Sequence, residues 1–114
     1  MAITGVHALF YSAEPDALRA TLRDAMGWDS VDIGGGWLIF RLPPAELGVH
    51  PGDSGHHELS FMCDDLDTTM EELRGKGVEF RGEVEERRFG RAVTMLLPGG
   101  VEVLLYQPSH PTAI

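Results

Sequence analysis

Residues 97–106 read LPGGVEVLLY and repeat the pattern of residues 42–50, which read LPPAELGVH. Each stretch starts with a Pro-containing turn and continues into a segment typical of a short strand. Allowing one insertion, three pairs of residues align: Glu46 with Glu102, Gly48 with Leu104, and His50 with Tyr106. A period of about fifty residues is typical of a fold built from two copies of one supersecondary unit.

The residue pattern of the first half of the chain predicts the order strand, helix, strand, strand, strand. Pro15 suits the first turn of the helix, and Gly27 suits a left-handed residue that ends it. The glycines at 34–36 supply a hairpin turn. The expected elements are a strand over 3–12, a helix from 15 to 26, and strands over 28–33, 37–42 and 46–50.

The second half predicts the same order. Asp64 and Asp65 are typical of a helix start, and Gly75 and Gly77 of its end. The expected elements are a strand over 57–63, this helix, and strands over 78–80, 92–97 and 101–107. Residues 83–91 hold six charged side chains in nine and are predicted to form a solvated loop or edge.

We therefore expect an α+β fold in which two βαβββ modules, residues 1–51 and 52–114, form one domain with a curved mixed sheet. One module leaves its concave sheet uncovered, whereas two modules pair their edges and share a core.

Composition narrows the class of protein. The 114 residues include 18 acidic and 9 basic side chains, a net charge of −9, which counts against nucleic acid and anionic membrane surfaces as partners. The single cysteine, Cys63, excludes an internal disulfide and is typical of a reducing compartment. No apolar run approaches the ~18 residues of a spanning helix, and the first residues lack a signal-peptide pattern. We expect a cytoplasmic protein.

Several segments together resemble the vicinal oxygen chelate superfamily, which groups glyoxalases, bleomycin resistance proteins and extradiol dioxygenases. They are HALFYS at 7–12 with DAMGW at 24–28, ELSFMCDDL at 58–66 with LRGKGVEF at 73–80, and PGGVEVLLYQP at 98–108. The resemblance covers nearly the whole chain. It implies a cup with helices outside and a small-molecule ligand or substrate inside, and commonly a homodimer.

In the metal-dependent members of this family, the first and fourth strands of each module supply the ligands of a divalent cation. Carried over to this chain, the first-strand positions are His7 and Glu58. The fourth-strand positions are Gly48 and Leu104, whose side chains cannot bind a metal, so the usual four-ligand site is not expected.

Side chains two positions away on a strand share the same face, which offers a displaced site. His7 and Glu58 would then bind the metal, with His50 or Glu102 as the third ligand. Imidazole and carboxylate ligands suit Fe, Mn, Zn or Ni. Each residue also has a structural alternative: His7 as a cup-lining residue bonded to Glu58 or Tyr11, His50 as a strand-end surface residue, and Glu46 and Glu102 as rim carboxylates.

Three functions stay open. The first is a metal-dependent lyase, isomerase or dioxygenase for a substrate with neighbouring oxygens, in which Glu102 or Tyr106 moves protons. The second is a metal-free protein that binds a ligand or drug, favoured by the loss of both fourth-strand acids. The third is association with another protein alone. We expect a homodimer, because two small modules leave long sheet edges, and the sequence leaves open whether the modules pair within a chain or between chains.

Overall fold

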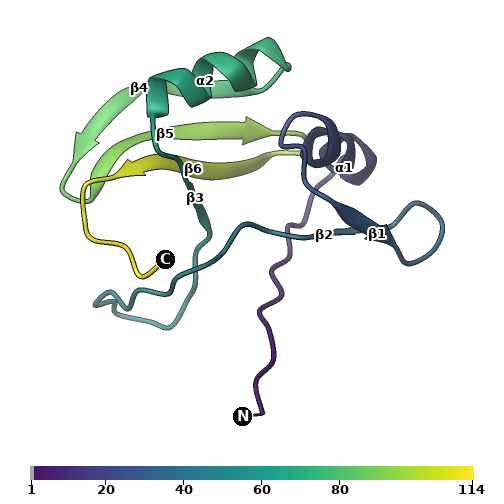
Figure 1. Cartoon of the computed structure of the whole chain (residues 1–114), viewed down its shortest axis with the longest axis horizontal. Helices are drawn as coiled ribbons and strands as arrows, with labels where there is room; N and C mark the ends of the chain where they lie inside the picture. Colours follow the sequence, from purple (N-terminus) through teal and green to yellow (C-terminus); the bar gives the residue numbers. More distant parts are fainter. Residues whose placement is uncertain (1) are drawn as a thin grey trace.

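The computed structural model describes residues 2–114 and confirms an α+β architecture (Figure 1). The elements in chain order are α1 (Pro15–Asp24), β1 (Ser30–Asp32), β2 (Leu38–Phe40), β3 (Ser60–Met62), α2 (Leu66–Gly75), β4 (Glu79–Arg87), β5 (Gly90–Leu97) and β6 (Val101–Pro108). Within residues 2–114, no helix is long and apolar enough to cross a membrane.

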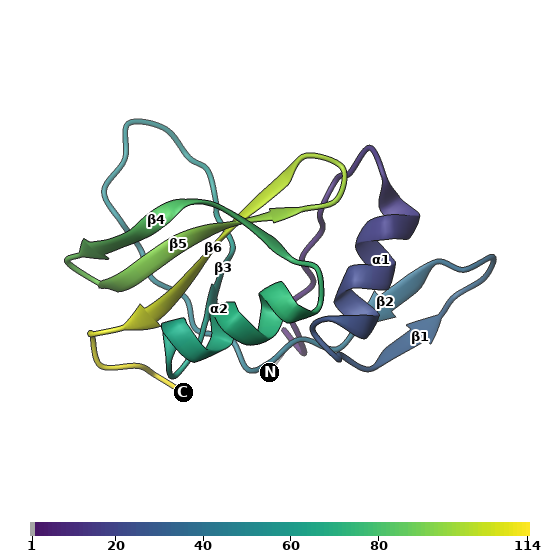
Figure 2. The same ribbon diagram turned by 90° about the horizontal axis from the view of Figure 1, so that it is seen from above.

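The second module contains all five expected elements in the expected order. Its four strands form a mixed sheet in the order β3-β6-β5-β4, in which β3 runs parallel to β6 and the other pairs are antiparallel. Figure 2 shows α2 lying along one face of this sheet. The opposite face carries no helix, which is the arrangement of half a cup.

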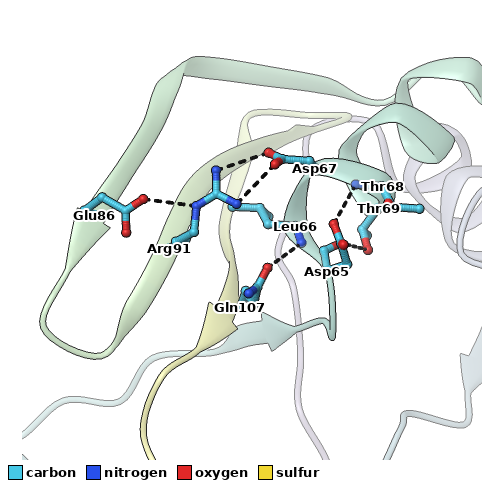
Figure 3. Close-up of polar contacts among 8 residues, drawn as sticks. All are labelled: Asp65, Leu66, Asp67, Thr68, Thr69, Glu86, Arg91 and Gln107. Carbon is cyan, nitrogen blue, oxygen red and sulfur yellow. Dashed lines mark hydrogen bonds and ion pairs between the residues drawn. The ribbon is translucent and has the colours of Figure 1, made fainter.

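The start of α2 is fixed by side chains from two directions (Figure 3). The Asp65 carboxylate accepts a hydrogen bond from the Thr68 backbone N–H at 3.0 Å, which satisfies one of the unpaired donors of the first turn. The Gln107 side-chain oxygen accepts from the Leu66 backbone N–H at 2.9 Å. The guanidinium of Arg91 joins the Asp67 carboxylate on α2 to Glu86 on β4. The predicted helix start is confirmed, and β6 holds it in place.

Of the two alternatives predicted for residues 83–91, a solvated loop or a sheet edge, the structure shows the edge, because β4 extends to Arg87, β5 starts at Gly90 and β4 is the outer strand of the sheet. The charged side chains are compatible with a strand since they lie on an outer edge and pair with one another. The Glu85 carboxylate accepts from Arg87 at 2.8 Å. Charges of this kind, together with a shift in register between Arg81 and Glu85, are typical of a protected sheet edge.

The first module is only partly formed within one chain. Strands β1 and β2 form the expected hairpin around glycines 34–36, with Val31 opposite Ile39. The expected strands over 3–12 and 46–50 are absent from the sheets of residues 2–114. A strand needs a neighbour for its backbone N–H and C=O groups, and here none is in register with these segments. In Figure 1 the N-terminal segment runs away from the sheet.

The core lies between the helices and the four-stranded sheet. It combines side chains of both helices with those of β5 and β6: Leu18, Leu22, Leu66, Met70, Leu73, Val93, Met95, Leu97, Val103 and Leu105. Leu66 and Met95 are fully buried. Both halves of the chain therefore contribute to one hydrophobic core.

The start of α1 is attached to the turn between β5 and β6. The Ser12 hydroxyl donates to the Pro98 carbonyl at 2.8 Å and accepts from the Glu14 backbone N–H at 3.0 Å. The Ala13 backbone N–H donates to the Gly99 carbonyl at 3.2 Å. These bonds fix the position of α1 relative to the sheet.

Candidate functional site

An open cavity of about 560 Å³ lies between α1, the β1–β2 hairpin and the segment that precedes α1. Small-molecule sites in proteins are typically concave, mostly apolar and of this size. The walls are largely aromatic and aliphatic, with Phe10, Trp28, Trp37 and Phe40 among them. The cavity therefore offers an apolar ligand a concave surface with mostly apolar walls.

The inner wall of the cavity is attached to the second module. The Phe61 ring of β3 meets Trp28 edge-on, with ring centroids 5.2 Å apart, and meets Phe10 edge-on at 6.3 Å. Such edge-to-face pairs are favourable beyond the area that they bury. The positions of Trp28 and Phe10 are consequently set by β3 and not only by their own loops.

The outer wall is more exposed. Trp37 keeps 54% of its surface exposed, and the guanidinium of Arg19 lies 5.3 Å from its ring centroid. Arg19 follows Leu18 on α1, so it lies beside the buried stripe of that helix. The sequence analysis did not single out Arg19.

His7, predicted from the family resemblance, lines this cavity. The other predicted ligands lie elsewhere. Glu58 is exposed and has its carboxylate 3.8 Å from the His56 imidazole. The His50 Nδ1 lies 2.7 Å from the carbonyl oxygen of Pro51.

A metal-ligand set is not assembled by one chain. Among residues 2–114, no three His, Cys, Asp or Glu side chains gather in a way that could hold a metal ion. Gly48 and Leu104 occupy the two positions where the resemblance implies acids. The residues present in a single chain do not fit a metal centre, and the ligand roles of His7, Glu58, His50 and Glu102 stay predictions.

Glu102 and Tyr106 lie together on the helix-free face of the four-stranded sheet. They alternate along β6 with Val103 and Leu105, which are buried in the core under α2. The Glu102 carboxylate accepts a hydrogen bond from the guanidinium of Arg81. This face is the inside of the expected cup. The positive charge of Arg81 there balances the negative charge of Glu102.

Tyr106 has a partner that sequence analysis missed. Its hydroxyl lies 3.0 Å from the His110 Nε2, and the Phe89 ring packs edge-on against it at 5.1 Å. The His110 Nδ1 lies 2.8 Å from the Pro111 carbonyl; donation to that carbonyl leaves Nε2 to accept from Tyr106. Burial raises the pKa of Tyr106, and the nearby Glu46 carboxylate raises it further. The hydroxyl therefore stays protonated and acts as a hydrogen-bond donor.

Neither a protein-family model nor a curated protein matches the chain. Solved structures match it over nearly its whole length. A member of the glyoxalase/bleomycin resistance protein/dioxygenase superfamily from Sphaerobacter thermophilus is 23% identical with a TM-score of 0.64, and the alignment covers 94% of this chain and 99% of that one. The chain has the glyoxalase/bleomycin resistance/dioxygenase fold.

Other structures with this fold differ in what their names say they do. TnmS3, an antibiotic-binding protein from Streptomyces sp. CB03234, is 24% identical with a TM-score of 0.65, over 96% of this chain and 99% of that one. A lactoylglutathione lyase from Agrobacterium tumefaciens is 16% identical with the same TM-score, over 94% and 96% of the two chains. Because the fold serves both binding and catalysis, function has to be argued from the cavity.

Proposed function

We propose that this protein binds a small, largely apolar molecule in the cavity beside α1, and that it does so without a metal ion. The observation that carries this proposal is the cavity itself, whose 560 Å³ and aromatic walls suit one drug-sized ligand. The fold shared with the antibiotic-binding TnmS3 supports a role in binding.

Three of the four side chains predicted as metal ligands contact other groups of the chain. Glu102 pairs with Arg81, Glu58 lies beside His56, and His50 lies against its neighbouring carbonyl. The match with the lactoylglutathione lyase therefore supports the fold of this protein, but it does not support a lyase reaction. A metal-free ligand-binding function, like that of bleomycin resistance proteins, therefore fits these contacts better than a metal-dependent reaction.

The test fills the cavity and measures binding of a neutral aromatic probe, 2-naphthylmethanol, by the fluorescence of Trp28 and Trp37. Ala8 lines the cavity, and Ala8→Phe adds an aromatic ring there. We expect saturable binding to the native protein and at least a tenfold loss in Ala8→Phe. The matched control is Ala113→Phe in the exposed C-terminal tail, which should bind as the native protein does. Absence of saturable binding, or equal binding by Ala8→Phe with native circular dichroism, contradicts the proposal.

We also propose that the protein works as a homodimer in which a second copy completes the cup. Residues 3–11 and 46–50 have no strand partner within the described chain, and apolar side chains on them are exposed. A partner that supplies the missing sheet edges would shelter both the segments and the open side of the cavity.

A further inference from the structure

The ionisable side chains that line the cavity are all basic or imidazole. They are His7, Arg19 and Arg41, and no carboxylate lines the cavity within residues 2–114. The chain as a whole has 18 acidic side chains and 9 basic ones, so acids outnumber bases two to one. The cavity is therefore a local basic region in an acidic protein.

Arg19 has a fixed place in the wall. Its side chain is only 23% exposed and stacks over the Trp37 ring. One of its nitrogens binds the Asp16 carboxylate at 3.1 Å, but Asp16 is 96% exposed and lies outside the cavity lining. An ion pair with so exposed a partner is weak, so the guanidinium keeps much of its attraction for an anion. Its planar set of donors matches a carboxylate or phosphate group.

Arg41 lies directly after β2. Its backbone N–H donates to the Asp29 carbonyl at 2.8 Å, which holds this residue next to the cavity. Among the ion pairs of residues 2–114, none involves the Arg41 guanidinium. The Arg41 guanidinium lies at the wall of an apolar cavity and has no ion-pair partner there. It is therefore well placed to form an ion pair with an anionic group of the ligand.

We infer that the ligand of this cavity is an organic anion, in which a carboxylate or similar group is attached to an apolar aromatic body. The aromatic part lies between Trp28 and Trp37, and the anionic group lies with Arg19 and Arg41. This inference rests on the proposed function, because it assigns a chemical class to the ligand of the same cavity.

The net charge of −9 opposes this preference only at long range. At physiological ionic strength, charges separated by more than about 8 Å are largely screened, whereas the two guanidinium groups act at contact distance. Long-range repulsion slows the approach of the anion, and the local cations decide its affinity once it is bound.

The experiment uses three probes that share one aromatic body and differ in charge: 2-naphthoate, 2-naphthylmethanol and 2-naphthylmethylammonium. We expect 2-naphthoate to bind at least tenfold more tightly than the ammonium probe at pH 7, with the alcohol between them. If no probe shows saturable binding, the proposed function fails and the inference with it. If the alcohol or the ammonium probe binds as tightly as 2-naphthoate, the binding function stands and the preference for anions is overturned.

Matched variants assign the preference to the two arginines. Arg41→Gln and Arg19→Gln should each lower the ratio of 2-naphthoate to 2-naphthylmethanol affinity at least fivefold, because only the naphthoate loses a charge interaction. The control, Arg88→Gln, removes an exposed guanidinium that does not line the cavity and should leave this ratio unchanged. A native affinity ratio in both cavity variants would overturn the inference.

Discussion

Asp65 illustrates how much of this fold depends on single side chains at helix ends. The bond from the Thr68 backbone N–H is the main reason that the pKa of the Asp65 carboxyl lies below its usual range, and the charge of Arg91 is a smaller one. Both causes act only when α2 is formed. In the unfolded chain the carboxyl titrates near its ordinary pKa of about 3.9.

This difference predicts how stability depends on pH. A carboxyl whose pKa is lowered by folding adds stability above its unfolded pKa and loses it as pH falls through the folded pKa. Asn also caps helices but does not titrate, so Asp65→Asn should lower the free energy of unfolding at pH 7 and show a smaller decline between pH 5 and pH 2. Urea unfolding at several pH values measures this. The control is Asp53→Asn in an exposed loop, and parallel pH profiles of native protein and Asp65→Asn would contradict the prediction.

At the scale of elements, the contact between the β5–β6 turn and the start of α1 joins the two modules. Gly99 and Gly100 in this turn both have left-handed backbone angles, with φ of +82° and +81°. They differ in their surroundings. A Cβ on Gly99 would collide with the Ser12 hydroxyl and come within 2.7 Å of two backbone nitrogens of the α1 start, whereas a Cβ on Gly100 meets open space.

The two glycines therefore form a matched pair of variants. Gly100→Ala should cost only the backbone penalty, about 1 to 2 kcal/mol of unfolding free energy. Gly99→Ala pays the same penalty and also separates the turn from α1, so it should cost clearly more. Since Ser12 lines the cavity, Gly99→Ala should in addition weaken 2-naphthylmethanol binding. Urea unfolding and Trp fluorescence measure both effects, and equal losses in the two variants would show that the turn does not position α1.

Elements with local hydrogen bonds were easier to predict from the sequence than elements whose hydrogen bonds join distant parts of the chain. Helices close their bonds locally, so Pro15, Gly27 and Asp65 mark their ends correctly. Strand β4 was predicted only over residues 78–80, because the charges around Glu85 suit a loop as well as an edge, and only the pairing with β5 shows that they lie on an edge strand. Strands over 3–12 and 46–50 were predicted from side-chain patterns, but pairing needs a neighbour that a single chain does not supply.

The candidate site was predictable in part. His7 was identified through the family resemblance and does line the cavity. Arg19 and Arg41 were not identified, because a lone arginine beside an apolar stripe looks the same in sequence whether it faces solvent or a cavity. Their shared place in the wall depends on how α1 packs against the hairpin, which no short-range pattern records. His110 was missed for the same reason, since the chain has to turn after Pro108 to bring it to Tyr106.

The whole molecule is more extended than a self-sufficient domain. Its radius of gyration is 15.1 Å, whereas the usual scaling gives about 13 Å for a compact domain of this length. Large apolar side chains on the unpaired segments are almost fully exposed, with Val6 at 90%, Leu47 at 91% and Val49 at 94%. Burying such surface is a strong driving force for association.

The two outer edges of the four-stranded sheet differ in how well they could accept a second copy in the proposed homodimer. The β4 edge is protected by charged side chains and by a bend at Gly82, where φ is +67°. The β3 edge has neither protection, because its three residues, Ser60–Met62, carry no charge. Because sheet edges without charges or bulges accept another strand, we expect the β3 edge to receive a segment of the second copy in the proposed homodimer.

The last prediction is that the protein is a homodimer whose segment 3–11 is hydrogen-bonded only in the dimer. Light scattering should give twice the chain mass of 12.5 kDa, and backbone amides 4–11 should be protected from hydrogen exchange although they have no strand partner in the single chain. Val6→Pro removes one backbone donor and should shift the mass toward the monomer and release the protection. The control is Thr112→Pro in the C-terminal tail, which should leave the mass unchanged. A native mass of 12.5 kDa across micromolar concentrations, with amides 4–11 exchanging freely, would mean that the two modules work without a second copy.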